Sequence, residues 1–190
     1  ATSPGLTTLD DKGFFFRTAP SDARGGQILA DITKDRKVKS VAITYTNNDY
    51  GKGLADVYAA AVKAHGIKVT IVSAHEDGKA DYSSEVATLA AAGGDAVAVI
   101  GYLDQGGKGI IQGSLDSGAF DKFILSDGMI GDSLTDTFGK DLNKSFGSMP
   151  GSMDKKTAGT FATVAKAAGI DSSGPYTGES YDAAALIVLA

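Results

Sequence analysis

The stretch LSDGMIG, residues 125–131, places an acidic side chain, Asp127, directly after an apolar run and directly before a glycine. A carboxylate there can cap a helix, ligate a metal, act as a general acid or base, or bind a cationic ligand. Gly128, Met129 and Ile130 follow it, so no long helix begins there for Asp127 to cap. The choice among the other kinds of chemistry depends on the rest of the chain.

Polar side chains gather in four loops, each of which follows an apolar run typical of a buried strand. These loops are residues 18–22, 46–51, 101–107 and 126–131. In an open parallel sheet, ligands bind outside the carboxyl ends of the strands, where such loops converge. The side chains that the loops offer are Ser21, Asp22, Asn47, Asn48, Asp49, Tyr50, Tyr102, Asp104, Ser126 and Asp127.

Most of these residues also have a structural interpretation. Asp22 and Asp49 lie where helix N-caps belong, and capping the free amides is the commoner use of an acidic residue at such a position. Tyr50 and Tyr102 are equally consistent with aromatic residues at the edge of the core. Asp127 is harder to explain structurally and is the first candidate for a functional side chain.

Catalytic motifs are weak in this chain. Of the two histidines, His65 falls at a predicted helix end, where a structural role is the default, and His75 ends a strand that reads as an edge strand. Residues 178–182 (GESYD) lack the second glycine of a nucleophile elbow. Residues 102–109 (YLDQGGKG) lack the first glycine and the final hydroxyl residue of a phosphate loop. We therefore expect no catalytic residue and no cofactor.

A magnesium-dependent hydrolase is the strongest catalytic alternative, because Asp49, Asp104 and Asp127 at strand ends are oxygen ligands of the kind that magnesium prefers. Against it, the four loops hold no lysine or arginine to bind a phosphate, and Lys108 lies just beyond one of them. A carboxylate with tyrosines instead suits a ligand that has an ammonium group and an apolar body. An amino acid fits that description.

Composition narrows the class of protein further. The 190 residues, 43% of them hydrophobic, are enough for one well-buried domain. The net charge of -5 is spread along the chain without a basic stripe, so nucleic acid is not expected as a partner. There is no cysteine, which excludes disulfides and thiolate metal sites, and we predict no metal site. No apolar run approaches the ~20 residues that span a bilayer.

Strands and helices are predicted to alternate. Strands are expected at residues 14–18, 40–45, 68–74, 96–100 and 122–125, with a short one within 145–151. Helices are expected at residues 21–36, 50–65, 82–92, 107–117 and 154–168 and at the end of the chain. Glycine closes three of them, in AHGIKV, AAAGGDAV and LDSGAF. Uninterrupted strands alternating with helices predict an α/β fold with a doubly wound, mostly parallel, Rossmann-like sheet.

The chain resembles the periplasmic substrate-binding proteins of branched-chain amino acid ABC transporters, which have the type I binding-protein fold. The resemblance rests, in order, on ATSPGLT, FFFRTAPSDARGGQILAD, VAITYTNNDYGKGLAD, AVIGYLDQGGKGIIQGSLDSGAF, LSDGMIG and GESYDAAALIVLA. Such proteins have two Rossmann-like lobes that trap the ligand when they close. The resemblance implies a fragment of such a protein: residues 1–13 are a crossing between lobes, residues 14–174 the second, ligand-binding lobe, and residues 175–190 a crossing and a helix of the first lobe.

The resemblance also implies a ligand site. Ala1 and Thr2 match the end of the segment that helps to bind the ligand carboxylate, and Tyr50 matches the tyrosine of a YG motif that faces the ligand. Tyr102 falls near a second ligand tyrosine. Asp127 matches an acidic position that receives the ligand α-ammonium, where leucine-binding relatives have glutamate.

The function implied is capture of a small solute, an amino acid above all, and its delivery to the membrane permease of an ABC transporter. No chemical step is involved, and the protein is expected in the periplasm or otherwise exported. A type I sensor or receptor lobe that signals to a partner is the alternative of the same fold. The terminal helix is apolar and carries no cap, so we expect a dimer through its exposed face.

Overall fold

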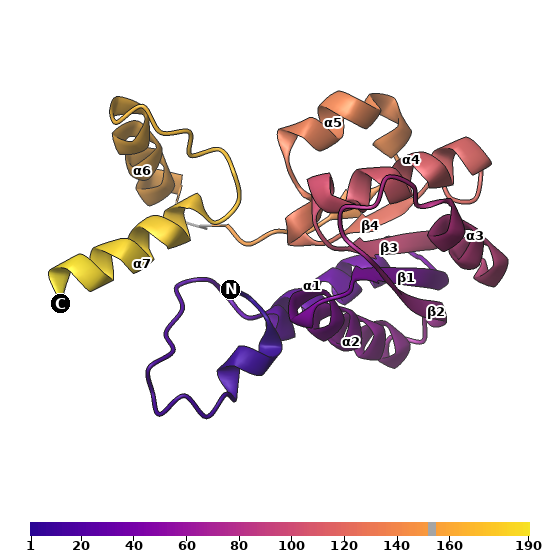
Figure 1. The fold of residues 1–190 in the computed structure, drawn as a ribbon, viewed down its shortest axis with the longest axis horizontal. Coiled ribbons are helices and arrows are strands. Elements are labelled where there is room, and N and C mark those ends of the chain that lie inside the picture. The colour runs from indigo at the N-terminus through magenta and orange to yellow at the C-terminus, as the bar shows by residue number, and fades with distance from the viewer. Residues whose placement is uncertain (152–154) are drawn as a thin grey trace.

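A computed structural model describes residues 1–151 and 155–190 of the chain. At its centre lies one five-stranded sheet in which every neighbouring pair is parallel (Figure 1). In the spatial order β2-β1-β3-β4-β5, the strands are β1 (Ser40–Thr46), β2 (Lys68–His75), β3 (Ala96–Ile100), β4 (Phe123–Leu125) and β5 (Phe146–Gly147). The predicted parallel α/β fold is confirmed, and β2 is an edge strand as expected.

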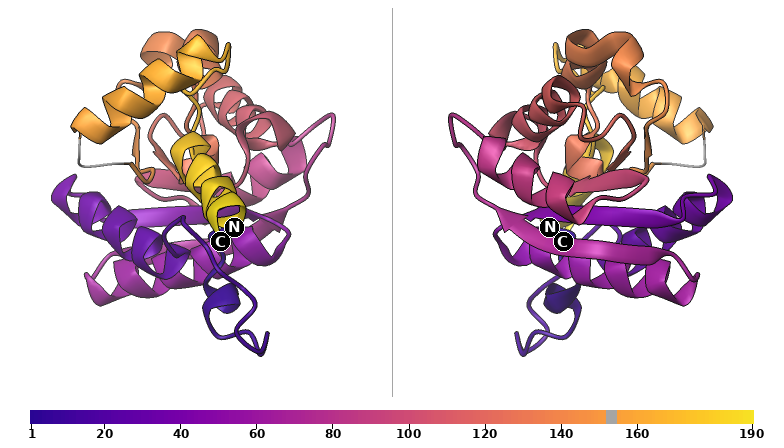
Figure 2. Two further views of the ribbon diagram at one scale, coloured as in Figure 1. Left: turned by 90° about the vertical axis from the view of Figure 1, so that its left-hand side faces the viewer. Right: turned by 90° about the vertical axis from the view of Figure 1, so that its right-hand side faces the viewer.

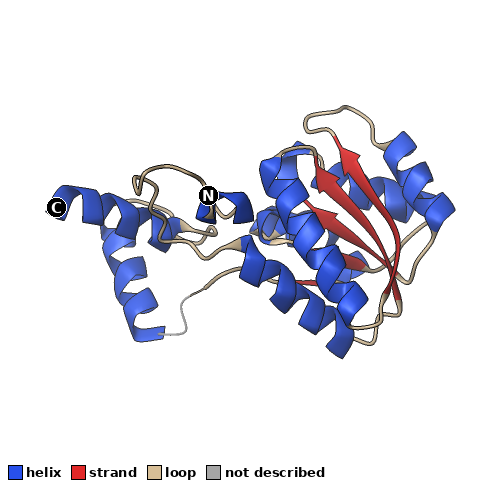
Figure 3. Ribbon diagram, turned by 90° about the horizontal axis from the view of Figure 1, so that it is seen from below, coloured by secondary structure: helices blue, strands red, loops and turns tan. Residues whose placement is uncertain are grey.

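Helices cover both faces of this sheet (Figures 2 and 3). One face packs against α1 (Asp22–Asp35) and α2 (Asp49–Ala64), and the other against α3 (Ser83–Ala92) and α4 (Gly107–Ser117). Successive strand residues alternate between the two cores: Val41 and Ile43 join the α1 and α2 side, whereas Ala42 joins the α3 and α4 side. Burial on both faces explains why the strands read as continuous apolar runs.

The starts of α1 and α2 each differ from the prediction by one residue. Ser21 and Asn48 are the N-caps of α1 and α2, and their side chains accept backbone amide hydrogen bonds of 3.2 and 2.9 Å. The predicted caps, Asp22 and Asp49, are therefore wrong. Both lie in the first turn, where an acidic side chain is stabilised by the helix dipole. The carboxylate of Asp22 is thus free of a capping role.

The glycines that end the helices have the predicted conformation. Gly66, Gly93 and Gly118 follow the last residues of α2, α3 and α4 with φ of 77°, 65° and 69°. A side chain with a Cβ adopts this left-handed region only at a cost, whereas glycine adopts it freely.

The strand expected at residues 14–18 is absent, and this prediction is wrong. The backbone amides of Gly13 and Phe15 donate to the side chain of Asp11, so a local turn occupies donors that a sheet would use. Phe14 and Phe16 are 83% and 86% exposed. An apolar run indicates a strand only when a neighbouring strand is within reach, and this loop has none.

In the described residues after β4, the chain forms α5 (Asp132–Phe138) before β5, and α6 (Lys155–Ala167) and α7 (Thr177–Leu189) after it. The first of these was not predicted. The expected helix at 154–168 is found as α6, although residue 154 lies outside the described residues. Figure 1 shows α6 and α7 to one side of the sheet and its flanking helices.

The end of α7 is apolar and exposed. Four consecutive side chains are between 63% and 84% exposed, namely Leu186, Ile187, Val188 and Leu189. The dimer expected through this helix stays a prediction. In the part of the chain that the structure describes, no helix combines the length and apolar character needed to cross a membrane.

Candidate functional site

The candidate site lies at the carboxyl edge of the sheet, where the strand order reverses. The chain runs from β1 outward to β2 and then crosses back to β3, so the connections that follow β1 and β3 diverge and leave a crevice between them. Tyr50, in the first turn of α2, and Tyr102, just after β3, meet there. Their rings stack with centroids 5.3 Å apart and an angle of 29° between the planes.

Asp127 follows β4 at the same edge. It begins the short 3₁₀ helix η3 (Asp127–Met129), and only 8% of the residue is exposed. The hydroxyl of Tyr50 donates a hydrogen bond of 2.8 Å to Oδ1, and the hydroxyl of Tyr176 donates one to Oδ2. Each carboxylate oxygen can accept a second hydrogen bond, so Asp127 is held in place by two donors and still has acceptor capacity.

The two phenols are donors over the whole physiological pH range. Burial raises the pKa of Tyr50, and the nearby charge of Asp127 raises it further. Burial likewise raises the pKa of Tyr176, and its hydrogen bond to Asp127 adds to the shift. Neither hydroxyl loses its proton near neutral pH, so both remain hydrogen-bond donors to Asp127.

Close packing around position 128 explains why a glycine follows Asp127. A Cβ at this position would lie 2.4 Å from the carbonyl oxygen of Gly101 and 3.2 Å from the Tyr50 hydroxyl. The backbone after β4 therefore packs directly against the backbone after β3. This close approach brings Asp127 within hydrogen-bonding distance of Tyr50.

All five residues predicted for the site line one open cleft of about 510 Å³. Its full lining is Ala1, Thr2, Ser3, Tyr50, Tyr102, Asp127, Gly128, Pro175 and Tyr176. A cleft of this size is typical of sites for small molecules. The structure thus brings the predicted residues together, and their roles toward a ligand stay predictions.

Thr2 is held against the lobe by contacts with α1 and the segment before it. The backbone N–H of Asp22 donates to the Thr2 carbonyl at 2.9 Å, and the Arg17 guanidinium donates to the Ser3 carbonyl at 3.0 Å. The Ser3 hydroxyl donates to the Asp49 carbonyl at 3.3 Å. These bonds fix the first residues of the chain at the rim of the cleft.

Tyr176 was not predicted as a site residue. It lies in the loop SSGPYTG at the N-terminus of α7, with φ of 65° and ψ of 9°. A lone aromatic residue in a loop of glycine, proline and serine was the only signal in the sequence. Nothing in the sequence indicates that this loop returns to the end of β4, 49 residues earlier.

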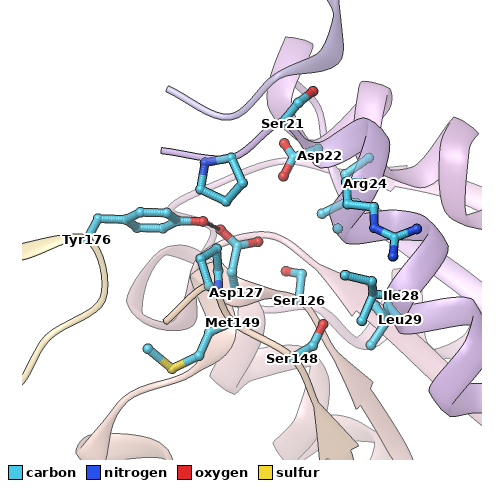
Figure 4. Close-up of a pocket in the computed structure, with 14 residues that line it drawn as sticks. Ser21, Asp22, Arg24, Ile28, Leu29, Ser126, Asp127, Ser148, Met149 and Tyr176 are labelled. Carbon is cyan, nitrogen blue, oxygen red and sulfur yellow. Dashed lines mark hydrogen bonds between the residues drawn. The ribbon is translucent and has the colours of Figure 1, made fainter. Parts of the chain in front are cut away.

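Asp22 is a second buried carboxylate beside the site. It is 5% exposed, and its Oδ2 has no hydrogen-bond partner among the described residues. Burial raises its pKa to about 6; hydrogen bonding with Thr2 and the charge of Arg17 oppose the rise, while the charge of Asp127 adds to it. Figure 4 shows Asp22 and Asp127 on the wall of one small pocket.

The aspartates of the hydrolase alternative do not form a metal site. Asp104 is 74% exposed at its side chain and pairs with Lys108 at 2.7 Å. Across residues 1–151 and 155–190, no three histidine, cysteine, aspartate or glutamate side chains lie close enough to hold a metal. The histidines are also engaged elsewhere: His65 contacts Asp31 at 2.7 Å, and His75 is buried against Thr44 at 2.8 Å.

A parallel doubly wound lobe with a tyrosine and carboxylate cleft at its switch point defines the chain as a lobe of a type I binding protein. The chain belongs to the periplasmic binding protein family, whose sequence model matches residues 1–190. Its relatives place it with the branched-chain amino acid type.

Curated relatives carry amino acid names. A Leu/Ile/Val-binding protein homolog 3 of Brucella melitensis is 36% identical over 108 residues, which are 56% of this chain and 29% of the relative. An amino acid binding protein of Pseudomonas aeruginosa is 28% identical over 140 residues, 73% of this chain and 37% of the relative. A Leu/Ile/Val-binding protein homolog 2 of Brucella abortus is 33% identical over 141 residues, with the same shares of 73% and 37%. The chain therefore spans between 29% and 37% of these relatives.

Solved structures show the same fold. A type 1 periplasmic binding protein of Bordetella pertussis superposes with a TM-score of 0.67 at 22% identity, over 78% of this chain and 41% of that one. A leucine binding protein of Thermotoga maritima superposes with a TM-score of 0.70 at 19% identity, over 86% of this chain and 49% of that one. At these identities the likeness concerns the fold alone.

Proposed function

We propose that this chain is the second lobe, with its crossings, of an exported solute-binding protein that captures an amino acid and delivers it to an ABC transporter without a chemical step. In this proposal residues 1–13 are a crossing, residues 14–174 the lobe, and residues 175–190 a crossing and a helix of the first lobe. The observation that carries it is the buried carboxylate of Asp127, held by two tyrosine hydroxyls on the wall of an open cleft.

Asp127 would receive the ligand α-ammonium. Its charge is largely shielded from water, and a charge-assisted hydrogen bond to a cation is strong in such surroundings. The stacked rings of Tyr50 and Tyr102 offer an apolar wall beside it for the body of the ligand. Ala1 and Thr2, which line the same cleft, would face the ligand carboxylate.

The segment before α1 is hydrogen-bonded to the first turn of α7. The hydroxyl of Thr18 donates a 2.7 Å hydrogen bond to the carbonyl of Glu179, which lies 161 residues later. This bond ties the proposed crossing at residues 175–190 to the lobe, beside the point where a second lobe would close over the ligand. Periplasmic location and a permease partner are proposed on the family alone.

The names of the relatives support an amino acid as the ligand, and Asp127 supports it independently. A ligand without a cation would leave this carboxylate buried and unpaired in the closed cleft, at a cost of several kcal/mol. No comparable observation favours the sensor lobe or the hydrolase.

Calorimetric titration tests the proposal. The protein encoded by the complete gene, and the 190-residue chain beside it, are titrated with α-amino acids of different side-chain size and with the matching deaminated acids. We expect at least one amino acid to bind the complete protein tightly and its deaminated partner to bind at least about a hundredfold more weakly. Equal binding of both partners, or silence across the panel, would contradict the proposal, and silence would favour the sensor or receptor lobe.

A further inference from the structure

A small second pocket lies on the α1 side of Asp127. Its volume is about 110 Å³, and Asp22, Asp127 and Tyr176 line it together with apolar residues of α1. Figure 4 shows the carboxyl group of Asp22 directed from the start of α1 toward Asp127. Asp127 and Tyr176 also line the larger cleft, so the two spaces adjoin at these side chains.

The hydrogen bonding of Asp22 with Thr2 leaves one oxygen of its buried carboxylate unexplained. Ser21 is the cap of α1, and the Arg17 guanidinium donates to the carbonyls of Thr2 and Ser3 and to the hydroxyl of Thr7. Oδ2 of Asp22 has no partner among the described residues. An acceptor kept from water without a donor destabilises the folded chain, and such groups are commonly explained by a bound ligand or ion.

The charges around this pocket favour a cation. Asp22 and Asp127 face it from α1 and from the end of β4, and their charges repel each other. Arg24 also lines the pocket, while Arg17 acts on Asp22 from the segment before α1. Tyr176 contributes a neutral hydroxyl to the pocket wall. A donor group that reached both carboxylates would satisfy Oδ2 and relieve the repulsion at once.

We propose that Asp22 is a second carboxylate for the ligand ammonium, so that one amino group donates hydrogen bonds to Asp22 and to Asp127 together. This inference rests on the proposed function and deepens it. A primary ammonium carries three N–H donors and can serve both carboxylates, whereas a tertiary ammonium carries one and can serve only one of them. The site therefore selects primary amines over their N,N-dimethyl derivatives.

The experiment compares three proteins with two ligands. The complete protein, its Asp22→Asn variant and its Asp35→Asn variant are titrated with the tightest-binding amino acid and with the N,N-dimethyl derivative of that amino acid. Asp35 is exposed at the end of the same helix, so its variant controls for the loss of one charge. Thermal melting confirms that each variant is folded.

We expect the parent to prefer the primary amine by about tenfold or more, which is what the loss of one charge-assisted hydrogen bond costs. Asp22→Asn should weaken binding of the primary amine by about tenfold and narrow the preference, and Asp35→Asn should change neither. The pH dependence of binding tests the same role without a variant. The affinity of the parent protein for the primary amine should fall about tenfold from pH 7 to pH 5, because the carboxyl of Asp22, with a pKa of about 6, takes up a proton.

The outcomes separate the two proposals. If the parent binds no amino acid, the proposed function fails and this inference fails with it. If the parent binds an amino acid, but accepts its N,N-dimethyl form equally well and keeps its affinity at pH 5, only the role of Asp22 is overturned. A folded Asp22→Asn protein that bound the primary amine as tightly as the parent would also overturn the role of Asp22.

Discussion

The hydroxyl of Tyr176 donates a hydrogen bond to Oδ2 of Asp127 across 49 positions of sequence. Tyr50 donates to the other oxygen of the same carboxylate from 77 positions away. One acidic side chain thus joins three segments: the start of α2, the end of β4 and the loop that precedes α7. The loop before α7 is therefore part of the site wall as well as a connection.

Asp127→Asn keeps the shape of the side chain and removes its charge. We expect calorimetry to show at least about a hundredfold weaker binding of an α-amino acid, because breaking a buried ion pair commonly costs about 3 to 5 kcal/mol. Asp132→Asn removes the same charge from the exposed first turn of α5 and should bind like the parent. An Asp127→Asn protein that bound as well as the parent would exclude this residue from the site.

Tyr176→Phe removes one donor from Asp127 and keeps the ring. A hydrogen bond to a charged group contributes about 1.5 to 3 kcal/mol, so we expect binding to weaken by roughly tenfold as the carboxylate loses its second support. Tyr181→Phe is the matched control, because its ring is 55% exposed in α7 and packs on Phe161. Calorimetry that finds the two variants equal would show that the hydroxyl of Tyr176 does not position Asp127.

Asp22→Asn should stabilise the unliganded protein at alkaline pH. The pKa of Asp22 is raised from 3.8 to about 6 in the folded state, so the folded chain binds more protons than the unfolded chain between about pH 4 and 6. The free energy of unfolding therefore falls as pH rises through this window. The variant never carries this charge, and it should gain roughly 1 to 3 kcal/mol at pH 8 and almost nothing below pH 4.

Thermal melts at pH 4 and pH 8 measure this difference. Asp35→Asn, whose carboxylate is exposed, should track the parent at both values. A folded Asp22→Asn that melts below the parent at pH 8 would mean that the buried carboxylate stabilises the unliganded fold, contrary to this prediction.

Gly128→Ala should disturb the site by steric overlap. The new methyl group would lie 2.4 Å from the Gly101 carbonyl oxygen, so the backbone that carries Asp127 must shift. We expect unfolding to become easier by about 1 to 3 kcal/mol and ligand affinity to fall with it. Gly159→Ala, in the middle of α6 with nothing within 4 Å, should leave affinity unchanged and raise stability slightly. Denaturant unfolding of both variants measures the change in stability. A Gly128→Ala protein as stable as the parent would contradict the close approach of the two backbone segments.

Local patterns predicted most of the elements, since apolar periodicity and terminal glycines act over a few residues. β1, β3 and α4 were found at or within one residue of their predicted bounds. The failures occurred where the outcome depended on distant partners. Residues 14–18 have strand composition without a neighbouring strand, and α5 is a short polar helix whose start follows a loop.

The residues of the candidate site also fall into those that the sequence predicted and those that it did not. Tyr50, Tyr102 and Asp127 were foreseen because the ends of parallel strands meet at one edge, a rule that needs only the order of the elements. Ala1 and Thr2 came from resemblance to a family. Tyr176 was missed, and Asp22 was assigned to a cap that Ser21 provides.

The sequence by itself determined the parallel α/β lobe, the helix ends and the acidic residue at the end of β4, because periodicity, turn chemistry and strand order are local properties. Only the tertiary structure decided that two tyrosines hold that carboxylate and that a second carboxylate lies beside it, with one oxygen that has no partner among the described residues. Hydrogen bonds and desolvation depend on which distant side chains are packed within a few ångströms, and that packing is a property of the whole fold.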